Sequence, residues 1–248
     1  MAKNRLRNCW RAKTKLYRQR KLQAAGVLLI VVLCGIAVFS FVETRVEGNP
    51  IRVACIGDSI TFGSGYPAKL NDLLGSNYTV ANFGVSGSTV STRSNMPYMN
   101  QPQFQEALDY HPNIVVIMLG TNDANINITR DDSSFENDYS QLINSFEELP
   151  GVQLIWVVKS PPIFTNNPSY NNTYLQKTLL PQIDDLADQK DLPTVDVYSA
   201  FKNHSDYFMD GVHPDDDGAS LIASQVYDAI TLPDGSPDTS QFGDGYSV

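Results

Sequence analysis

Between residues 51 and 230, five short apolar runs alternate with segments of helical periodicity. The runs are residues 51–56, 79–83, 114–119, 152–158 and 194–197, and apolar residues recur at helical spacing in residues 135–149 and 219–230. Runs that are almost uninterrupted in apolar residues are typical of strands buried on both faces. Parallel neighbours in a sheet need crossover connections, which helices supply. The alternation therefore predicts an α/β fold, a three-layer α/β/α sandwich around a five-stranded parallel sheet.

Charge is distributed unevenly along the chain. Residues 1–21 hold nine of the 18 Lys and Arg residues, whereas residues 43–248 hold nine basic and 27 acidic side chains. Such an acidic domain repels phosphate backbones and anionic lipid head groups, because binding them needs Lys and Arg to neutralise their charge. We therefore expect no nucleic-acid partner.

Residues 24–42 contain no charged side chain. At 1.5 Å per residue, a helix of this length nearly crosses a hydrocarbon layer about 30 Å thick. The basic segment before it predicts a cytoplasmic N-terminus and an extracytoplasmic remainder, by the positive-inside rule. We therefore expect a single-pass membrane protein. A cleaved signal peptide, followed by secretion, is the alternative.

These patterns predict five parts along the chain. Residues 1–23 form a basic cytoplasmic segment, residues 24–42 a transmembrane helix that acts as a signal anchor, and residues 43–50 a linker. Residues 51–232 form the folded domain. Residues 233–248, which have little apolar content, form a disordered tail.

Polar residues follow the ends of the predicted strands. Ser59 comes shortly after the first strand, Gly87 after the second and Asn122 after the third. Asp210 and His213 lie between the fifth strand and the last helix. Because sites in parallel α/β sheets form outside the carboxyl ends of the strands, we expect all five residues at that edge.

These residue types suit acyl transfer by a serine nucleophile. A serine hydroxyl needs an adjacent base, and an imidazole is suited to that role near neutral pH. Asp210, three residues before His213, can fold back and accept the Nδ1 proton of the ring. The backbone N–H groups of Ser59 and Gly87, with the side-chain amide of Asn122, would stabilise an oxyanion. The lack of a Cβ at Gly87 would allow the backbone to approach the substrate closely.

The chain has two other histidines that are candidate bases. His111 precedes a predicted strand, which places it at the opposite edge of the sheet. His204 lies in a polar stretch near Asp206 and competes with His213. The order and placement of the motifs favour His213.

Each motif also has a structural interpretation. Gly-Asp-Ser at residues 57–59 fits a turn in which the serine caps a helix. Asp123 fits a helix cap, and Asp210 with Gly211 fits a common turn. The acidic residues 215–217 fit the start of the last helix, where they stabilise its dipole, so we assign no metal to them.

Four segments, in this order, resemble the four sequence blocks of the SGNH, or GDSL-type, hydrolases. Residues 56–61 resemble the nucleophile block, with Ile60 in place of the usual leucine, and residues 82–87 the oxyanion-glycine block. Residues 119–123 resemble the Gly-X-Asn-Asp block and residues 210–214 the Asp-X-X-His block. The resemblance implies a flavodoxin-like sandwich without a metal or cofactor. It also implies the four name-giving roles for Ser59, Gly87, Asn122 and His213, with Asp210 completing the triad.

The resemblance implies the reaction, hydrolysis of carboxylic esters, more narrowly than the substrate. Residues 88–103 and 160–170 follow the second and fourth strands and are expected to form the pocket walls, including Tyr98 and Tyr170. Their aromatic and amide side chains favour an acylated small molecule or glycan, with an O-acetyl or other short acyl group on a carbohydrate. Lysophospholipase or thioesterase activity, O-acyl transfer to a glycan, and a non-catalytic glycan-binding module are the alternatives.

Overall fold

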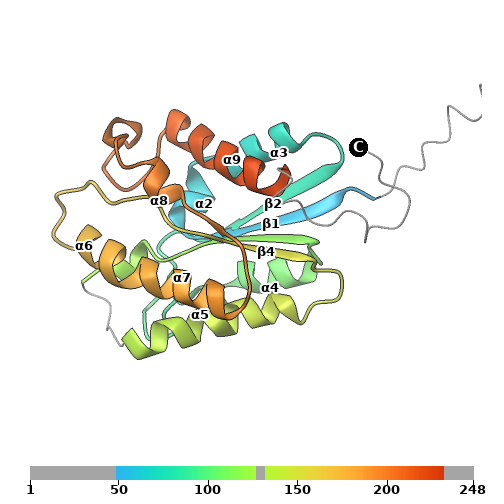
Figure 1. The fold of residues 1–248 in the computed structure, drawn as a ribbon, viewed down its shortest axis with the longest axis horizontal. Coiled ribbons are helices and arrows are strands. Elements are labelled where there is room, and N and C mark those ends of the chain that lie inside the picture. The colour runs from blue at the N-terminus through green and yellow to red at the C-terminus, as the bar shows by residue number, and fades with distance from the viewer. Residues whose placement is uncertain (1–48, 127–131, 232–248) are drawn as a thin grey trace, which may run out of the picture. The chain divides into compact units, whose positions relative to one another are not determined.

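The computed structural model describes residues 49–126 and 132–231, which form one sheet with helices on both of its faces (Figure 1). The strands are β1 (Ile51–Gly57), β2 (Tyr78–Gly84), β3 (Ile114–Met118), β4 (Leu154–Val158) and β5 (Thr194–Val195). The α-helices are α2 (Ser59–Gly63), α3 (Tyr66–Leu74), α4 (Pro102–Asp109), α5 (Asp132–Glu147), α6 (Asn172–Tyr174), α7 (Leu180–Gln189), α8 (Val197–Ala200) and α9 (Asp216–Thr231). Short 3-10 turns η1 (Tyr98–Asn100), η2 (Asn122–Ala124) and η4 (Ser205–Tyr207), and a π-helical turn η3 (Leu175–Leu179), complete the described elements.

The sheet is entirely parallel, with the strand order β2-β1-β3-β4-β5. This is the flavodoxin-like order, in which the chain changes direction of travel between β1 and β3. Gly57 of β1 is in register with both Gly84 of β2 and Met118 of β3. The segments that follow these three strands therefore leave the sheet at the same level. The predicted five-stranded parallel sheet with flanking helices is confirmed.

Alternate residues of the strands pack on opposite faces of the sheet, as the period of two requires. On one face, Ile56, Ile117 and Val157 pack in a core with residues of α4, α5 and α7. On the other, Cys55 and Val116 pack with residues of α3 and α9. Figure 1 shows the two helix layers on either side of the strands. Burial on both faces explains why the strand sequences are almost continuously apolar.

The fifth strand is shorter than predicted, since residues 194–197 were expected and only Thr194 and Val195 pair with β4. Asp196 ends the strand because its carboxylate accepts hydrogen bonds from the backbone N–H and the hydroxyl of Ser199, at 2.9 Å each. An N-cap of this kind starts α8 at Val197. The prediction treated an apolar valine as strand although the capping signal stood directly before it.

Several predicted parts of the chain lie outside the described residues. They are the basic segment 1–23, the transmembrane helix 24–42, most of the linker 43–50 and the tail 233–248. Within residues 49–126 and 132–231, no helix has the length and apolar character needed to cross a bilayer. Attachment to a membrane through residues 24–42 stays a prediction.

Candidate active site

Ser59 is the first residue of α2, a short helix that begins directly after β1. The chain turns sharply there because Gly57 has no side chain: a Cβ at this position would lie 1.9 Å from Thr61 Oγ1 and 2.7 Å from the Met118 carbonyl oxygen. Asp58 caps the helix, accepting a hydrogen bond from Ile60 N at 2.9 Å. The cap is therefore Asp58 and not Ser59, so the Ser59 hydroxyl is not needed for the helix start.

The Ser59 hydroxyl lies at hydrogen-bond distance from His213, with 2.9 Å between Oγ and Nε2. On the other side of the ring, His213 Nδ1 lies 2.8 Å from Asp210 Oδ2. When Nδ1 is protonated and its N–H donates a hydrogen bond to the carboxylate, Nε2 presents its lone pair to the hydroxyl. Ser59 and His213 are 154 residues apart in the sequence, and the sheet edge brings them together.

The Asp210 carboxylate also shapes the turn that carries the histidine. Its Oδ1 accepts hydrogen bonds from Val212 N at 2.9 Å and from His213 N at 2.8 Å. Partial burial opposes ionisation, but the hydrogen bonds from the ring and backbone of His213 and from Val212 N outweigh it and lower the pKa of Asp210 to about 2. Asp210 is therefore an anion throughout the range in which an imidazole titrates. The three-residue spacing allows one carboxylate to hold both the turn and the ring.

Gly87 lies in the turn that follows β2. Ser88 N donates to the Val85 carbonyl at 3.1 Å, which closes a four-residue turn with Gly87 at its third position. Gly87 has φ = +79°, as the third position of a type II turn requires. A Cβ on Gly87 would meet no atom within 4 Å. Within the protein, glycine is needed at this position because the backbone is left-handed. No neighbouring atom in the described part of the chain leaves too little space for a Cβ.

Asn122 lies in η2, directly after the loop that leaves β3, and only 8% of it is exposed. Its side-chain nitrogen donates to the Ser88 carbonyl at 3.0 Å. Because a primary amide has two N–H groups, one remains for another acceptor. The hydroxyl of Tyr170 lies 3.4 Å from the amide oxygen, on the far side of the amide. The structure thus joins Asn122 directly to the residue that follows Gly87.

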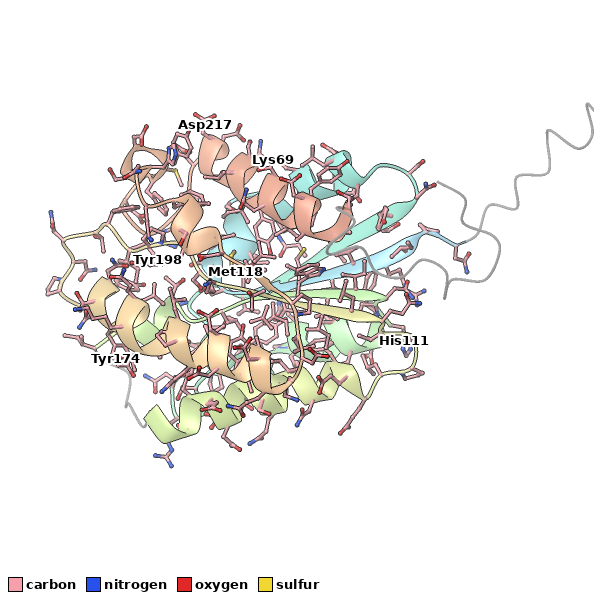
Figure 2. The ribbon with its side chains drawn as sticks, viewed as in Figure 1. Lys69, His111, Met118, Tyr174, Tyr198 and Asp217 are labelled. Carbon is pink, nitrogen blue, oxygen red and sulfur yellow. The ribbon has the colours of Figure 1, made fainter. Side chains whose placement is uncertain are left out.

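The other two histidines have different surroundings. His111 is exposed and lies at the end of the molecule where the strands begin (Figure 2). Its carbonyl accepts a hydrogen bond from Arg52 Nε at 2.8 Å. The ring of His204 stacks on that of Tyr207, with 4.5 Å between the centroids. Only His213, among the three, is hydrogen-bonded to Ser59.

The two segments predicted to form pocket walls, residues 88–103 and 160–170, differ in how far the structure supports that prediction. Tyr98 is fully buried and its hydroxyl donates to the Phe83 carbonyl at 2.8 Å, so it belongs to the core and its assignment to a wall was wrong. The segment after β4 does reach the site. Phe164 N donates to the Gly211 carbonyl at 2.7 Å, next to the Asp210 turn, and Ile126 N donates to the Ser169 carbonyl at 2.8 Å.

Sequence reasoning missed two buried carboxylates beneath the site. The Asp123 carboxylate accepts hydrogen bonds from Val90 N at 3.0 Å and Ser91 N at 2.9 Å, where a helix cap was the alternative considered. Asp58 is 1% exposed, and its Oδ2 has no hydrogen-bond partner among residues 49–126 and 132–231. Burial raises the pKa of Asp58 to about 7, although the hydrogen bond from Ile60 N opposes the rise. The burial of Asp58 and Asp123 depends on packing between segments far apart in the sequence, which the local sequence does not reveal.

Replacing Asp58 with asparagine is expected to make stability less dependent on pH. A raised pKa in the folded state favours folding below the unfolded carboxyl pKa of about 4, and that contribution is lost as pH rises through about 7. Asparagine keeps an oxygen for Ile60 N but does not titrate. Urea unfolding at pH 5 and pH 8 should show the wild type losing about 2 kcal/mol more than Asp58→Asn over this interval. Equal losses in the two proteins would contradict the buried, neutral carboxyl.

Together, the parallel sheet and the line of serine, histidine and aspartate at its carboxyl edge define a class, proteins with an α/β hydrolase-like fold. Residues 55–221 match the GDSL-like lipase/acylhydrolase family, and they make up well over half of the chain. The chain belongs to this family, within the SGNH hydrolase superfamily.

One relative with a stated activity is an acetylxylan esterase from Xylanibacter ruminicola. It is 32% identical over 208 residues, an alignment that covers 73% of this chain and 43% of the esterase. The chain therefore spans less than half the length of that enzyme.

Solved structures share the fold at lower identity. A carbohydrate acetylesterase family member from Sinorhizobium meliloti has a TM-score of 0.61 and 22% identity, over 73% of this chain and 98% of that one. The lipase/acylhydrolase from Enterococcus faecalis has a TM-score of 0.59 and 20% identity, over 73% and 95%. The M. smegmatis aryl esterase has a TM-score of 0.58 and 22% identity, over 71% and 98%.

Proposed function

We propose that the protein removes O-acetyl or other short acyl groups from a carbohydrate, with Ser59 as nucleophile, His213 as general base and Asp210 as the partner of the base. The observation that carries this proposal is the unbroken line of hydrogen bonds, 2.9 Å from Ser59 to His213 and 2.8 Å from His213 to Asp210. The name of the acetylxylan esterase, 32% identical to this chain, supports the carbohydrate ester.

The reaction proceeds in two acyl-transfer steps. Ser59 Oγ attacks the ester carbonyl while His213 Nε2 takes its proton, and the oxyanion accepts hydrogen bonds from the backbone N–H groups of Ser59 and Gly87 and from the Asn122 amide. His213 then returns the proton to the leaving sugar oxygen, which releases the alcohol. Water repeats the sequence on the acyl-serine and releases the carboxylic acid.

The acyl group is tested with p-nitrophenyl acetate, butyrate and octanoate, and the carbohydrate with acetylated xylan. We expect kcat/KM to be at least about tenfold higher for acetate than for octanoate, and acetate to be released from the xylan. Uncatalysed hydrolysis is measured in parallel with the Ser59→Ala protein. A preference for octanoate, without release of acetate from xylan, would contradict the carbohydrate proposal.

One observation favours a second candidate, hydrolysis of a more apolar ester such as a lysophospholipid. Among the residues that the structure describes, five large hydrophobic side chains are exposed, and three of them lie within four residues of a site residue in the sequence: Phe62, Ile126 and Met209. Met209, which immediately precedes Asp210, is 74% exposed. Exposed apolar side chains around a site suit acyl chains. The chain-length series distinguishes the two candidates.

A further inference from the structure

A buried carboxylate connects the two loops that carry the oxyanion donors. Asp123 is 4% exposed and follows Asn122 directly in η2. Its Oδ2 accepts a hydrogen bond from Val90 N at 3.0 Å and its Oδ1 from Ser91 N at 2.9 Å. These donors belong to the loop after β2, more than 30 residues earlier in the chain. A single side chain thus fixes one loop against the other.

The same loop is held at Ser88, the residue that follows Gly87. The Ser88 carbonyl accepts the hydrogen bond from the Asn122 amide at 3.0 Å, and its hydroxyl donates to the Gly57 carbonyl at 3.3 Å. Val85 N also donates to the Gly57 carbonyl, at 2.9 Å. The residues on both sides of Gly87, Val85 and Ser88, therefore contact β1. Ser88 also contacts η2. Asp123 supplies the outermost of these contacts.

We propose that Asp123 is a positioning residue of the oxyanion hole, which holds the Gly87 N–H and the Asn122 amide in register by binding Val90 N and Ser91 N. The inference rests on the proposed function, because it needs Gly87 and Asn122 as the oxyanion donors. Asp123 touches no reacting atom. It acts through the loop, on donors whose effect depends on placement within a few tenths of an ångström.

The free-energy cost of burying the Asp123 carboxyl is consistent with its proposed positioning role. Burial raises the pKa of Asp123 to about 6, although the hydrogen bonds from Ser91 N and Val90 N oppose the rise. An ionised carboxylate therefore has a free-energy cost in this position, which a neutral side chain would avoid. A neutral amide accepts only through its oxygen, so it would leave one of the two N–H groups facing a donor.

Asp138 provides a matched control from the same region. It is also buried, at 4% exposed, and its carboxylate accepts hydrogen bonds from Thr92 N at 2.8 Å and from the Thr92 hydroxyl at 3.0 Å. Asp138 is in α5 and contacts the loop one residue beyond the Asp123 contacts. Loss of its hydrogen bonds should affect stability without moving Asn122 or Gly87.

The experiment compares Asp123→Asn and Asp138→Asn with the wild type in the full-length protein. Because a lost oxyanion donor lowers kcat about 100-fold or more, a displaced one should lower kcat for p-nitrophenyl acetate about tenfold to 100-fold in Asp123→Asn. KM should stay within about threefold, and the pH midpoint of the rate should not move. The rate of Ser59 phosphorylation by diethyl p-nitrophenyl phosphate should fall by a similar factor, since its phosphoryl oxygen uses the same donors. Asp138→Asn should keep kcat within about twofold even if its Tm falls.

The outcomes separate this proposal from the proposed function. A wild type that neither hydrolyses the esters nor reacts with the phosphate triester contradicts the proposed function itself. An active wild type with Asp123→Asn within twofold of it, or with Asp138→Asn equally impaired, overturns the positioning role alone. If Asp123→Asn does not fold, Asp123→Ser, which keeps one acceptor, is judged by the same criteria. Failure of both to fold, while Asp138→Asn folds, would give Asp123 a role in stability only and also overturn the proposal.

Discussion

Replacing Ser59 with alanine is expected to lower kcat for p-nitrophenyl acetate at least about a thousandfold, with no loss of folding. The residual rate would come from substrate binding and the oxyanion donors, which remain when a nucleophile is removed. Folding should survive because Asp58, not Ser59, caps α2, and the contact described for the Ser59 hydroxyl is the one to His213. Steady-state kinetics and thermal unfolding of the purified variant measure the two effects.

Ser220→Ala is the matched control for this experiment. Ser220 lies in α9, where its exposed hydroxyl donates to the Asp216 carbonyl at 2.8 Å. Its kcat should equal that of the wild type. If Ser59→Ala kept the wild-type rate, Ser59 would not be the nucleophile and the proposed mechanism would be wrong.

Replacing His213 with asparagine is expected to have an effect of similar size, a loss of at least about a thousandfold in kcat. Serine and histidine of a triad act as a unit, so removing either costs about as much as removing both. The double variant Ser59→Ala/His213→Asn should therefore be hardly less active than either single variant. Asparagine keeps the backbone contacts of the Asp210 turn, which involve the N–H groups of Val212 and residue 213.

His204→Ala is the control that distinguishes the two candidate bases. His204 stacks on Tyr207 and has no hydrogen bond to Ser59, so its replacement should change kcat by no more than about twofold. A thousandfold loss in His204→Ala, with an active His213→Asn protein, would reverse the assignment that both the sequence order and the geometry favour.

The sequence predicted the fold closely because its main determinant is local. Strands covered on both faces need unbroken apolar runs, and such runs mark all five strands to within two residues at each end. The fifth strand was overextended because Val197 is apolar although Asp196 had already started a helix. Tyr98 was misplaced for a related reason: an aromatic ring with a hydroxyl suits a pocket wall or a core, and only its hydrogen bond to Phe83 decides between them.

The sequence by itself determined which apolar runs form strands and which polar residues follow each run at its carboxyl end. Only the tertiary structure decided which of these residues touch, because contacts such as Ser59 with His213 and Asp123 with Ser91 join segments 154 and 32 residues apart. Local sequence propensity carries no information about contacts between residues so far apart in the sequence. The parallel register, which places Gly57, Gly84 and Met118 at one level, converts the linear order into a single site.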